Sequence, residues 1–329
     1  MSTSTTTPPL TDSPDAFAQR ILDAVLGAMD ALAIHLGDRL GWYRSLAEDG
    51  PASPVELAER TGTDARYARE WLEQQAVTGI LGVDEDGRFS LSPVGVAVLA
   101  DPHSLAYSTP MARMVCGAAM HLPELLEAYR TGGGVSWSRL GRDARESQAD
   151  ANRPWFEHRL EGALRSVPEL DAVLRKPGAR LLDIGCGAVW STIALAHACP
   201  GGHVDGVDVD LASVELARTN VESDDAVAQR ITVIESDAAD LPEATYDAAF
   251  AFECIHDMPQ PVEVLDAVRR TLAPGAPLIV VDEAVAETFT APGDDVERLI
   301  VRMRLGEVVF EIFENFGHNL PELSYAPCG

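Results

Sequence analysis

The feature that most constrains this chain is a short apolar strand, residues 181–184, that runs directly into the glycine turn 185–187. A helical segment follows over 190–198, and a second apolar strand leads to Asp208. This order of strand, glycine turn, helix, strand and acid predicts a parallel α/β sheet that holds a ribose-bearing ligand. The glycines allow close approach to the backbone, and an acid roughly 20–25 residues further on accepts hydrogen bonds from ribose hydroxyls.

Beyond residue 179 the chain alternates between strand and helix periods. With helices between them, strands are expected at 180–184, 203–207, 230–235, 247–252 and 277–282. The fold class predicted for this part is therefore α/β, a doubly wound Rossmann-like sheet. After the fifth strand we expect a helix over 294–314 and no alternating pair of strands.

The N-terminal part carries the signals of a winged helix. Apolar residues at helical spacing predict one amphipathic helix over 15–41. Ser53 and Glu56 form a capping box at the start of a short helix, and Thr63 is the expected cap of the next one. Apolar segments then flank an Asp-Gly turn at residues 86–87, which predicts a hairpin. Helices followed by a hairpin make a winged-helix unit.

The charge of the chain argues against nucleic acid as a partner. There are 52 acidic and 25 basic residues, for a formal net charge of −27. Because phosphate contacts supply most non-specific DNA affinity, a winged helix with this charge is poorly suited to DNA. We interpret it as a homodimerisation unit that helps to wall a substrate pocket, with a DNA-binding regulator as the less favoured alternative. Its second helix and wing carry mixed or acidic charge (Asp64, Arg66, Arg69, Glu70, Glu73, Asp84, Glu85, Asp86, Arg88).

The sequence favours a reducing compartment and no membrane span. The five cysteines form no C-x-x-C pair, which fits free thiols in the cytoplasm. Residues 1–14 are rich in Ser, Thr and Pro and are expected to be a disordered tail rather than a signal peptide. The most apolar helical stretch, 21–40, contains Asp23, Asp30 and Asp38, so it is not expected to cross a bilayer.

Four motifs together resemble a known family: 182–187, Asp208, 235–238 and 252–257. The segment 180–282 is similar to the class I S-adenosylmethionine-dependent methyltransferases. Nearly the whole chain, winged helix included, resembles small-molecule O-methyltransferases of bacteria and plants. The resemblance implies methyl transfer from S-adenosylmethionine to a small-molecule acceptor, a hydroxyl being favoured, with no metal required.

The resemblance also implies the cofactor contacts. An acid ending each of the first three strands would face the same sheet edge: Asp183 for the cofactor's ammonium or for orienting the loop, and Asp208 for the ribose, with Asp210 as a substitute. Asp237 would meet the adenine amino group. The remaining cofactor-binding residues are expected to be Gly185, Gly187, Ala238 and Phe252.

One departure from the family lies in the glycine loop. Family loops usually carry a third glycine, and this chain has Ala188-Val189 there. A β-branched residue strongly resists positive φ. We therefore expect either an ordinary backbone at this point or a reshaped loop with weaker cofactor binding.

His256 is the candidate catalytic base. It follows the fourth strand, at the edge where open α/β sheets bind ligands. In plant-type O-methyltransferases a His-Asp pair at this point supplies the base, and His256-Asp257 is the match here. Asp282, directly after the fifth strand, is expected to orient the imidazole. Two alternatives stay open: His256 as a wall of the pocket, or His256-Asp257 as a structural turn before the next helix.

The predicted organisation has four parts: tail 1–14, winged-helix dimerisation domain 15–102, helical linker or lid 103–175, and catalytic domain 176–329. The lid carries Trp137, Trp155 and Phe156, which are candidates for the substrate pocket. Methyltransferase sheets usually end in an antiparallel hairpin, which this chain is expected to lack. A second hypothesis is accordingly a catalytically idle relative that serves as a ligand sensor or dimer partner.

Overall fold

The computed structural model describes residues 13–132, 134–135, 137–241, 245–282 and 291. The described chain separates into two compact units, residues 13–101 with 106–116 and residues 102–105 with 117–282, which are considered one at a time. The four-part domain division predicted above stays a prediction. The expected helix over 294–314, the expected lack of a C-terminal hairpin and most of the expected tail lie outside the described residues.

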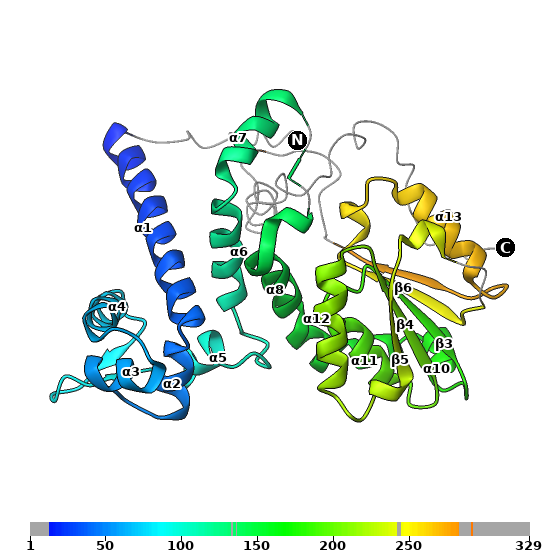
Figure 1. Ribbon diagram of the computed structural model, residues 1–329, viewed down its shortest axis with the longest axis horizontal. Coiled ribbons are helices and arrows are strands. Elements are labelled where there is room, and N and C mark those ends of the chain that lie inside the picture. Colours follow the sequence, from blue (N-terminus) through cyan, green and yellow to red (C-terminus); the bar gives the residue numbers. More distant parts are fainter. Residues whose placement is uncertain (1–12, 133, 136, 242–244, 283–290, 292–329) are drawn as a thin grey trace, which may run out of the picture. The chain divides into compact units, whose positions relative to one another are not determined.

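The first unit is a bundle of helices with a small two-stranded hairpin (Figure 1). Its core gathers around an aromatic group in which the rings of Trp42 and Tyr43 pack against Trp71, with ring centroids 4.8 and 5.0 Å apart. This is the predicted arrangement of helices followed by a wing. In chain order the elements are α1 (Pro14–Arg39), α2 (Trp42–Glu48), α3 (Pro54–Thr61), α4 (Ala65–Val77), β1 (Gly82–Val83), β2 (Phe89–Ser90) and α5 (Pro93–Leu99), followed by α6 (Thr109–Ala119), whose residues are divided between the two units.

The helix caps of this unit follow the sequence with one correction. The capping box is formed, since the Ser53 N–H donates to Glu56 over 2.7 Å and the Glu56 N–H donates to the Ser53 hydroxyl over 3.4 Å. The expected cap at Thr63 is wrong: Asp64 begins α4 and accepts from the N–H groups of Arg66 and Tyr67. A carboxylate at a helix N-terminus is favoured by the dipole as well as by these two hydrogen bonds.

The second unit contains a five-stranded parallel sheet in the order β5-β4-β3-β6-β7 (Figure 1). Each strand lies within a residue or two of its predicted position. The elements before the sheet are helical: α7 (Leu122–Thr131), α8 (Trp137–Trp155), a π-helical turn (Phe156–Leu160), α9 (Glu161–Arg165) and α10 (Pro168–Leu174). The sheet and its connections comprise β3 (Arg180–Ile184), α11 (Trp190–Ala198), β4 (His203–Asp208), α12 (Leu211–Glu222), β5 (Ile231–Glu235), β6 (Ala248–Phe252), α13 (Pro261–Thr271) and β7 (Leu278–Val281).

Alternation along the strands builds a core on each face of this sheet. In β3, Leu181 packs with residues of α10, α11 and α12, whereas Leu182 and Ile184 pack with α13. The chain leaves β3 in one direction for β4 and β5 and returns on the other side for β6 and β7. A parallel sheet with this reversal forms a ligand crevice at its carboxyl edge, beside the strand where the order changes.

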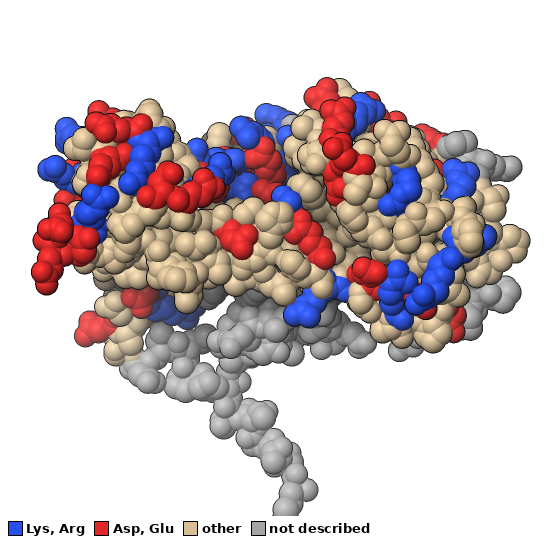
Figure 2. Space-filling view, turned by 90° about the horizontal axis from the view of Figure 1, so that it is seen from below, with Lys and Arg blue, Asp and Glu red and all other residues tan. Residues whose placement is uncertain are grey.

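The surface bears charges of both signs. On the face shown in Figure 2, Lys and Arg side chains of the described residues are intermixed with Asp and Glu. No described helix is both long enough and apolar enough to cross a bilayer.

Candidate active site

A cavity of about 560 Å³ opens at the carboxyl edge of the sheet. Its lining comes from the glycine turn after β3, from the ends of β4, β5 and β6, and from one side of α8. Ligand pockets in proteins commonly have volumes of roughly 300–1,000 Å³, so the space suits a nucleoside-sized ligand with room beside it. The predicted residues that line it are Gly185, Gly187, Asp208, Asp237, Ala238, Phe252, Trp137 and Phe156.

Two positions of the turn require glycine, each for a different structural reason. Gly185 has φ +63°, and a Cβ added there would come within 2.8 Å of the Cys254 Cβ. Gly187 has φ +50°, and its N–H donates to Asp208 Oδ2 over 2.8 Å. Only glycine adopts such backbone angles without strain. The turn therefore brings bare backbone against the cavity and fixes the acid of the next strand.

Val189 occupies the place of the missing third glycine and adopts the left-handed region, with φ 65° and ψ 16°. The alternative of an ordinary backbone here is therefore wrong. Strain of this kind costs about 1–3 kcal/mol. The Val189 side chain is fully buried in the core beside α11, and burying a valine contributes about 1.5–3 kcal/mol. Burial of the side chain therefore offsets the strain of the left-handed backbone at Val189.

Asp183 lies beneath the cavity rather than in its lining. Its carboxylate is buried and accepts hydrogen bonds from the hydroxyls of Ser191 and Thr192, over 2.7 and 2.6 Å. These partners belong to the first turn of α11. Of the two roles expected for Asp183, this geometry favours orientation of the loop and helix. Burial, with a smaller contribution from the charge of Asp208, raises its pKa to about 6.

This raised pKa predicts a pH-dependent stability. The folded protein holds the proton of Asp183 more tightly than the unfolded chain, so stability from this residue is present at low pH and is lost as pH rises toward about 6. Asparagine cannot ionise, so Asp183→Asn does not lose stability in this way. We expect the free energy of unfolding of the variant, measured relative to wild type, to rise by roughly 2–3 kcal/mol from pH 4 to pH 8. Urea denaturation of wild type and variant at pH 4 and at pH 8 measures these free energies. If the variant differs from wild type by the same amount at the two pH values, the prediction is contradicted.

Asp208 and Asp210 lie together where β4 ends. The two Asp208 oxygens accept from the N–H groups of Gly187 and Asp210, over 2.8 and 2.9 Å, and the Val209 N–H also interacts with this carboxylate. One Asp210 oxygen is occupied by the Ser213 N–H and hydroxyl and by Arg145. Burial raises the pKa of Asp208. For Asp210 the effect of burial is outweighed by the Ser213 and Arg145 hydrogen bonds, so its pKa lies below the usual range.

The ends of β5 and β6 supply the rest of the lining at this edge. Asp237 lies two residues past β5 and accepts from the Ala239 N–H over 2.8 Å, while Ala238 is buried in the cavity wall. Phe252 ends β6, and its ring stacks against Phe250 with centroids 5.9 Å apart. These three residues form an apolar wall with one carboxylate at its rim, which suits a purine ring with an exocyclic amine.

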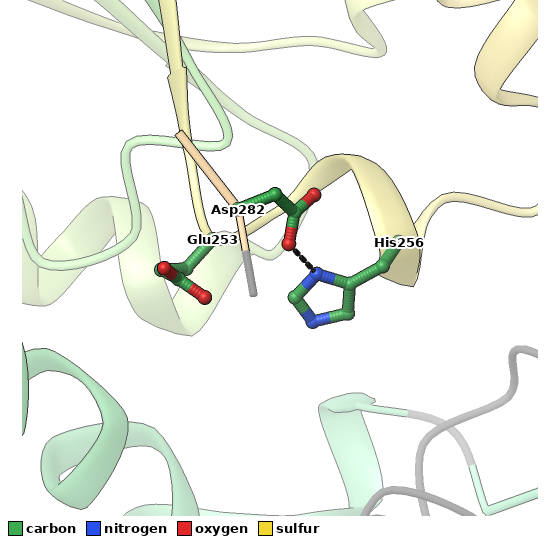
Figure 3. Close-up of side chains that lie close together, drawn as sticks. All are labelled: Glu253, His256 and Asp282. Atoms are coloured by element: carbon green, nitrogen blue, oxygen red, sulfur yellow. Dashed lines mark hydrogen bonds and ion pairs between the residues drawn. The ribbon is translucent and has the colours of Figure 1, made fainter. Parts of the chain in front are cut away.

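His256 belongs to a short turn, Ile255–Asp257, that follows β6. Its Nδ1 is hydrogen-bonded to Asp282 Oδ1, and its Nε2 lies on the opposite side of the ring, 3.4 Å from Asp257 Oδ1 (Figure 3). Glu253 faces the same space, and one ligand atom from each of Glu253, His256 and Asp282 lies within 4.8 Å of the others. His256 and Asp282 are not among the lining residues, whereas their neighbours Asp257 and Met258 are.

The aromatic residues of the predicted lid divide between two environments. Trp137 and Phe156 line the cavity, whereas Trp155 does not and is 38% exposed. Pro154 lies inside the last turn of α8, just before the π-helical turn that begins at Phe156. The Phe156 ring meets Phe252 edge-on, with centroids 5.3 Å apart. Phe156 and Trp137 are thus the members of the predicted aromatic group that line the site.

Sequence reasoning missed a polar stripe on α8. Arg145, Gln148 and Asn152 line the cavity together with Trp137 and Phe156. Their spacing of three and four residues puts them on one helical face, and this was the available signal. Glu253 was also missed; it lines the cavity with φ +50° directly after β6.

The comparisons with known proteins agree with this geometry. Residues 181–275 match a family described as "Methyltransferase domain", and residues 28–100 match the "Rv2258c-like winged HTH domain". The ubiquinone biosynthesis O-methyltransferase of Xylella fastidiosa is 31% identical over 156 residues, which cover 44% of this chain and 62% of that relative. The chain thus spans less than two thirds of the length of that relative.

Solved structures share the fold over most of their length. The mitomycin 7-O-methyltransferase MmcR superposes with a TM-score of 0.65 at 23% identity, covering 91% of this chain and 87% of the other. Human N-acetylserotonin methyltransferase, solved in complex with S-adenosylmethionine, superposes with a TM-score of 0.65 at 18% identity, and the match covers 92% of this chain and 89% of the other. At these identities the likeness establishes the fold.

Residues 181–275 of the second unit match as a methyltransferase domain, and the parallel sheet has the fold that the solved methyltransferases share. The chain joins this domain to an N-terminal winged-helix domain of the Rv2258c-like type. The resemblance and the fold class expected from the sequence are thereby confirmed.

Proposed function

We propose that this protein transfers the methyl group of S-adenosylmethionine to a hydroxyl of a small-molecule acceptor. The observation that carries the proposal is the cavity at the carboxyl edge of the sheet, where the glycine turn, Asp208, Asp237 and Phe252 line one space. A solved relative of the same fold contains S-adenosylmethionine, which supports this choice of ligand.

The hydrogen-bond partners of the acidic residues indicate which part of the cofactor each would bind. Asp208 lines the cavity, is held by backbone N–H groups alone and would accept from the ribose hydroxyls, whereas Asp210 is engaged by its helix and by Arg145. Asp237, beside Ala238, would accept from the adenine amino group. Asp183 would act indirectly, by holding the first turn of α11 against the glycine loop.

His256 would serve as the general base. We assign the Nδ1 hydrogen to the bond with Asp282, so that Nε2, which lies 3.4 Å from Asp257 Oδ1, is the ring nitrogen that would take a proton. Bound S-adenosylmethionine supplies an electrophilic methyl group, and alignment of the acceptor oxygen with it supplies most of the rate. As the oxygen attacks, the hydroxyl proton passes to Nε2, and Asp282 stabilises the imidazolium that forms.

The test of this function is methyl transfer itself. Purified protein is incubated with S-adenosylmethionine labelled in the methyl group and with a panel of small phenols and alcohols, and products are identified by mass. Labelled ether products that require the protein would support the proposal. Binding of S-adenosylhomocysteine with no transfer to any acceptor would instead favour the hypothesis of a catalytically idle ligand sensor or dimer partner.

A homodimer formed through the first unit is part of the proposal. One side of α1 exposes large apolar side chains at spacings of three and four residues, and such a stripe is typical of a helix that packs against a partner. These side chains are between 45% and 57% exposed: Ile21, Leu22, Val25, Leu26, Met29, Leu32 and Leu36.

Charge placed on that stripe should separate the dimer. Met29→Glu puts a carboxylate among apolar neighbours, and we expect it to yield monomers by light scattering at micromolar concentration, where wild type is dimeric. Asp23→Glu on the same helix is the matched control. A dimer that survives Met29→Glu unchanged would locate the interface elsewhere.

A further inference from the structure

Arg145 is a cation in an otherwise acidic cavity. Among the described lining residues it is the one Lys or Arg, while the acids are Asp208, Asp210, Asp237, Glu253 and Asp257. Its side chain is only 13% exposed, and its Nε donates to Asp210 Oδ2 over 2.9 Å. A guanidinium carries five N–H donors, so the terminal N–H groups remain for a further acceptor.

The position of Arg145 is fixed relative to the ribose acid. Asp210 follows Asp208 by two residues and caps α12 by accepting from Ser213. Trp137, on the other half of α8, approaches the same Ser213, with its indole nitrogen 3.5 Å from the hydroxyl. The backbone of α8 is non-helical at Gly141, so the part before this break and the part after it each contact the segment that begins α12. Val209, just before that segment, lines the cavity.

We propose that Arg145 is a cofactor-binding residue that holds the adenosyl end of S-adenosylmethionine, with Trp137 beside it. This inference rests on the proposed function. Ribose oxygens and adenine ring nitrogens are acceptors that the free N–H groups of a guanidinium suit, and its flat face can stack on a purine. Pairing with Asp210 pre-orients the guanidinium, so little side-chain freedom is lost on binding.

The ion pair also keeps Asp210, the acid next to Asp208, in its charged form. Without Arg145 the Asp210 carboxylate, 9% exposed, would be a buried charge beside Asp208. Two neighbouring carboxylates that cannot both ionise freely raise each other's pKa. Arg145 would therefore contribute twice, by its own contacts to the ligand and by holding Asp210 in place as the cap of α12.

The test compares Arg145→Gln with Arg142→Gln. Arg142 lies on the same helix, is 78% exposed and pairs with Glu146, so it is a matched control. The probes are S-adenosylhomocysteine and 5′-methylthioadenosine, which keeps the adenosyl group and lacks the amino-acid part. We expect Arg145→Gln to weaken both ligands by about tenfold, the size of one charged hydrogen bond. Arg142→Gln should stay within twofold of wild type.

Folding of each variant is checked by its thermal transition, and Arg145→Lys is the second variant should Arg145→Gln fail to fold. Lysine keeps the charge but not the planar guanidinium with its several donors, so a loss of affinity for both ligands that Arg142→Gln does not show would support the inference. Unchanged affinity in a folded variant, or a loss for S-adenosylhomocysteine alone, would overturn it. If wild type binds neither ligand, the proposed function itself fails, which is a distinct outcome.

Discussion

Replacing His256 by alanine is expected to lower the rate of methyl transfer at least tenfold, toward the roughly 10²–10⁴-fold that a general base is worth. The reason is the loss of the Nε2 atom that would take the acceptor's proton, while Asp282 holds the other ring nitrogen. The affinity for S-adenosylhomocysteine should change little, because His256 does not line the cavity. Single-turnover rates and calorimetry on the same samples measure the two quantities.

Three control experiments distinguish His256 as a general base from His256 as a structural residue or a metal ligand. His197→Ala removes a histidine that is 50% exposed and paired with Asp224, and should leave the rate unchanged. Asp282→Asn should lower the rate without abolishing binding. A chelator should have no effect if Glu253, His256 and Asp282 act without a cation. An unaltered rate in His256→Ala would remove the assignment and leave His256 as a wall or a turn residue.

Replacing Asp208 by asparagine is expected to weaken S-adenosylhomocysteine binding about 10–100-fold. Asparagine keeps the size of the side chain but removes the charge and one acceptor, and hydrogen bonds to a charged group are worth about 1.5–3 kcal/mol. Its amide would also face the Gly187 N–H, which now donates to the carboxylate over 2.8 Å. Asp266→Asn, on the 61% exposed Asp266 of α13, is the control.

Calorimetry with S-adenosylhomocysteine and with methionine distinguishes loss of the ribose contact from a general loss of the site. Because methionine has no ribose, its weaker binding should be unaffected by Asp208→Asn. Equal affinity of wild type and variant for S-adenosylhomocysteine would show that another group holds the ribose, and Asp210 would be examined next.

The parts that sequence predicts well depend on local and repeating signals. Residues 180–184 and 248–252 are short apolar segments bounded by polar or glycine residues, so the strands could be located within a residue or two. Their parallel order puts Asp208 and Asp237 on one edge regardless of detail. The capping box at Ser53 is likewise decided by residues that are neighbours in the chain.

The parts that sequence misses depend on distant packing. Whether Val189 accepts a left-handed backbone is decided by the core that encloses its side chain, and no propensity encodes this. Arg145 lies 65 positions from Asp210 in the chain, so their ion pair follows from how α8 packs on the sheet. Asp183 has the residue type of a ligand, yet burial beneath the loop gives it hydroxyl partners instead.

The most direct measurement is a calorimetric titration of the wild-type protein with S-adenosylhomocysteine. The account predicts micromolar binding with one site per chain, because the glycine turn, Asp208 and Asp237 line one cavity and Val189 adopts a left-handed backbone at the end of the turn. No binding by a folded sample would contradict the central claim. The cavity would then belong to a methyltransferase fold that serves another purpose.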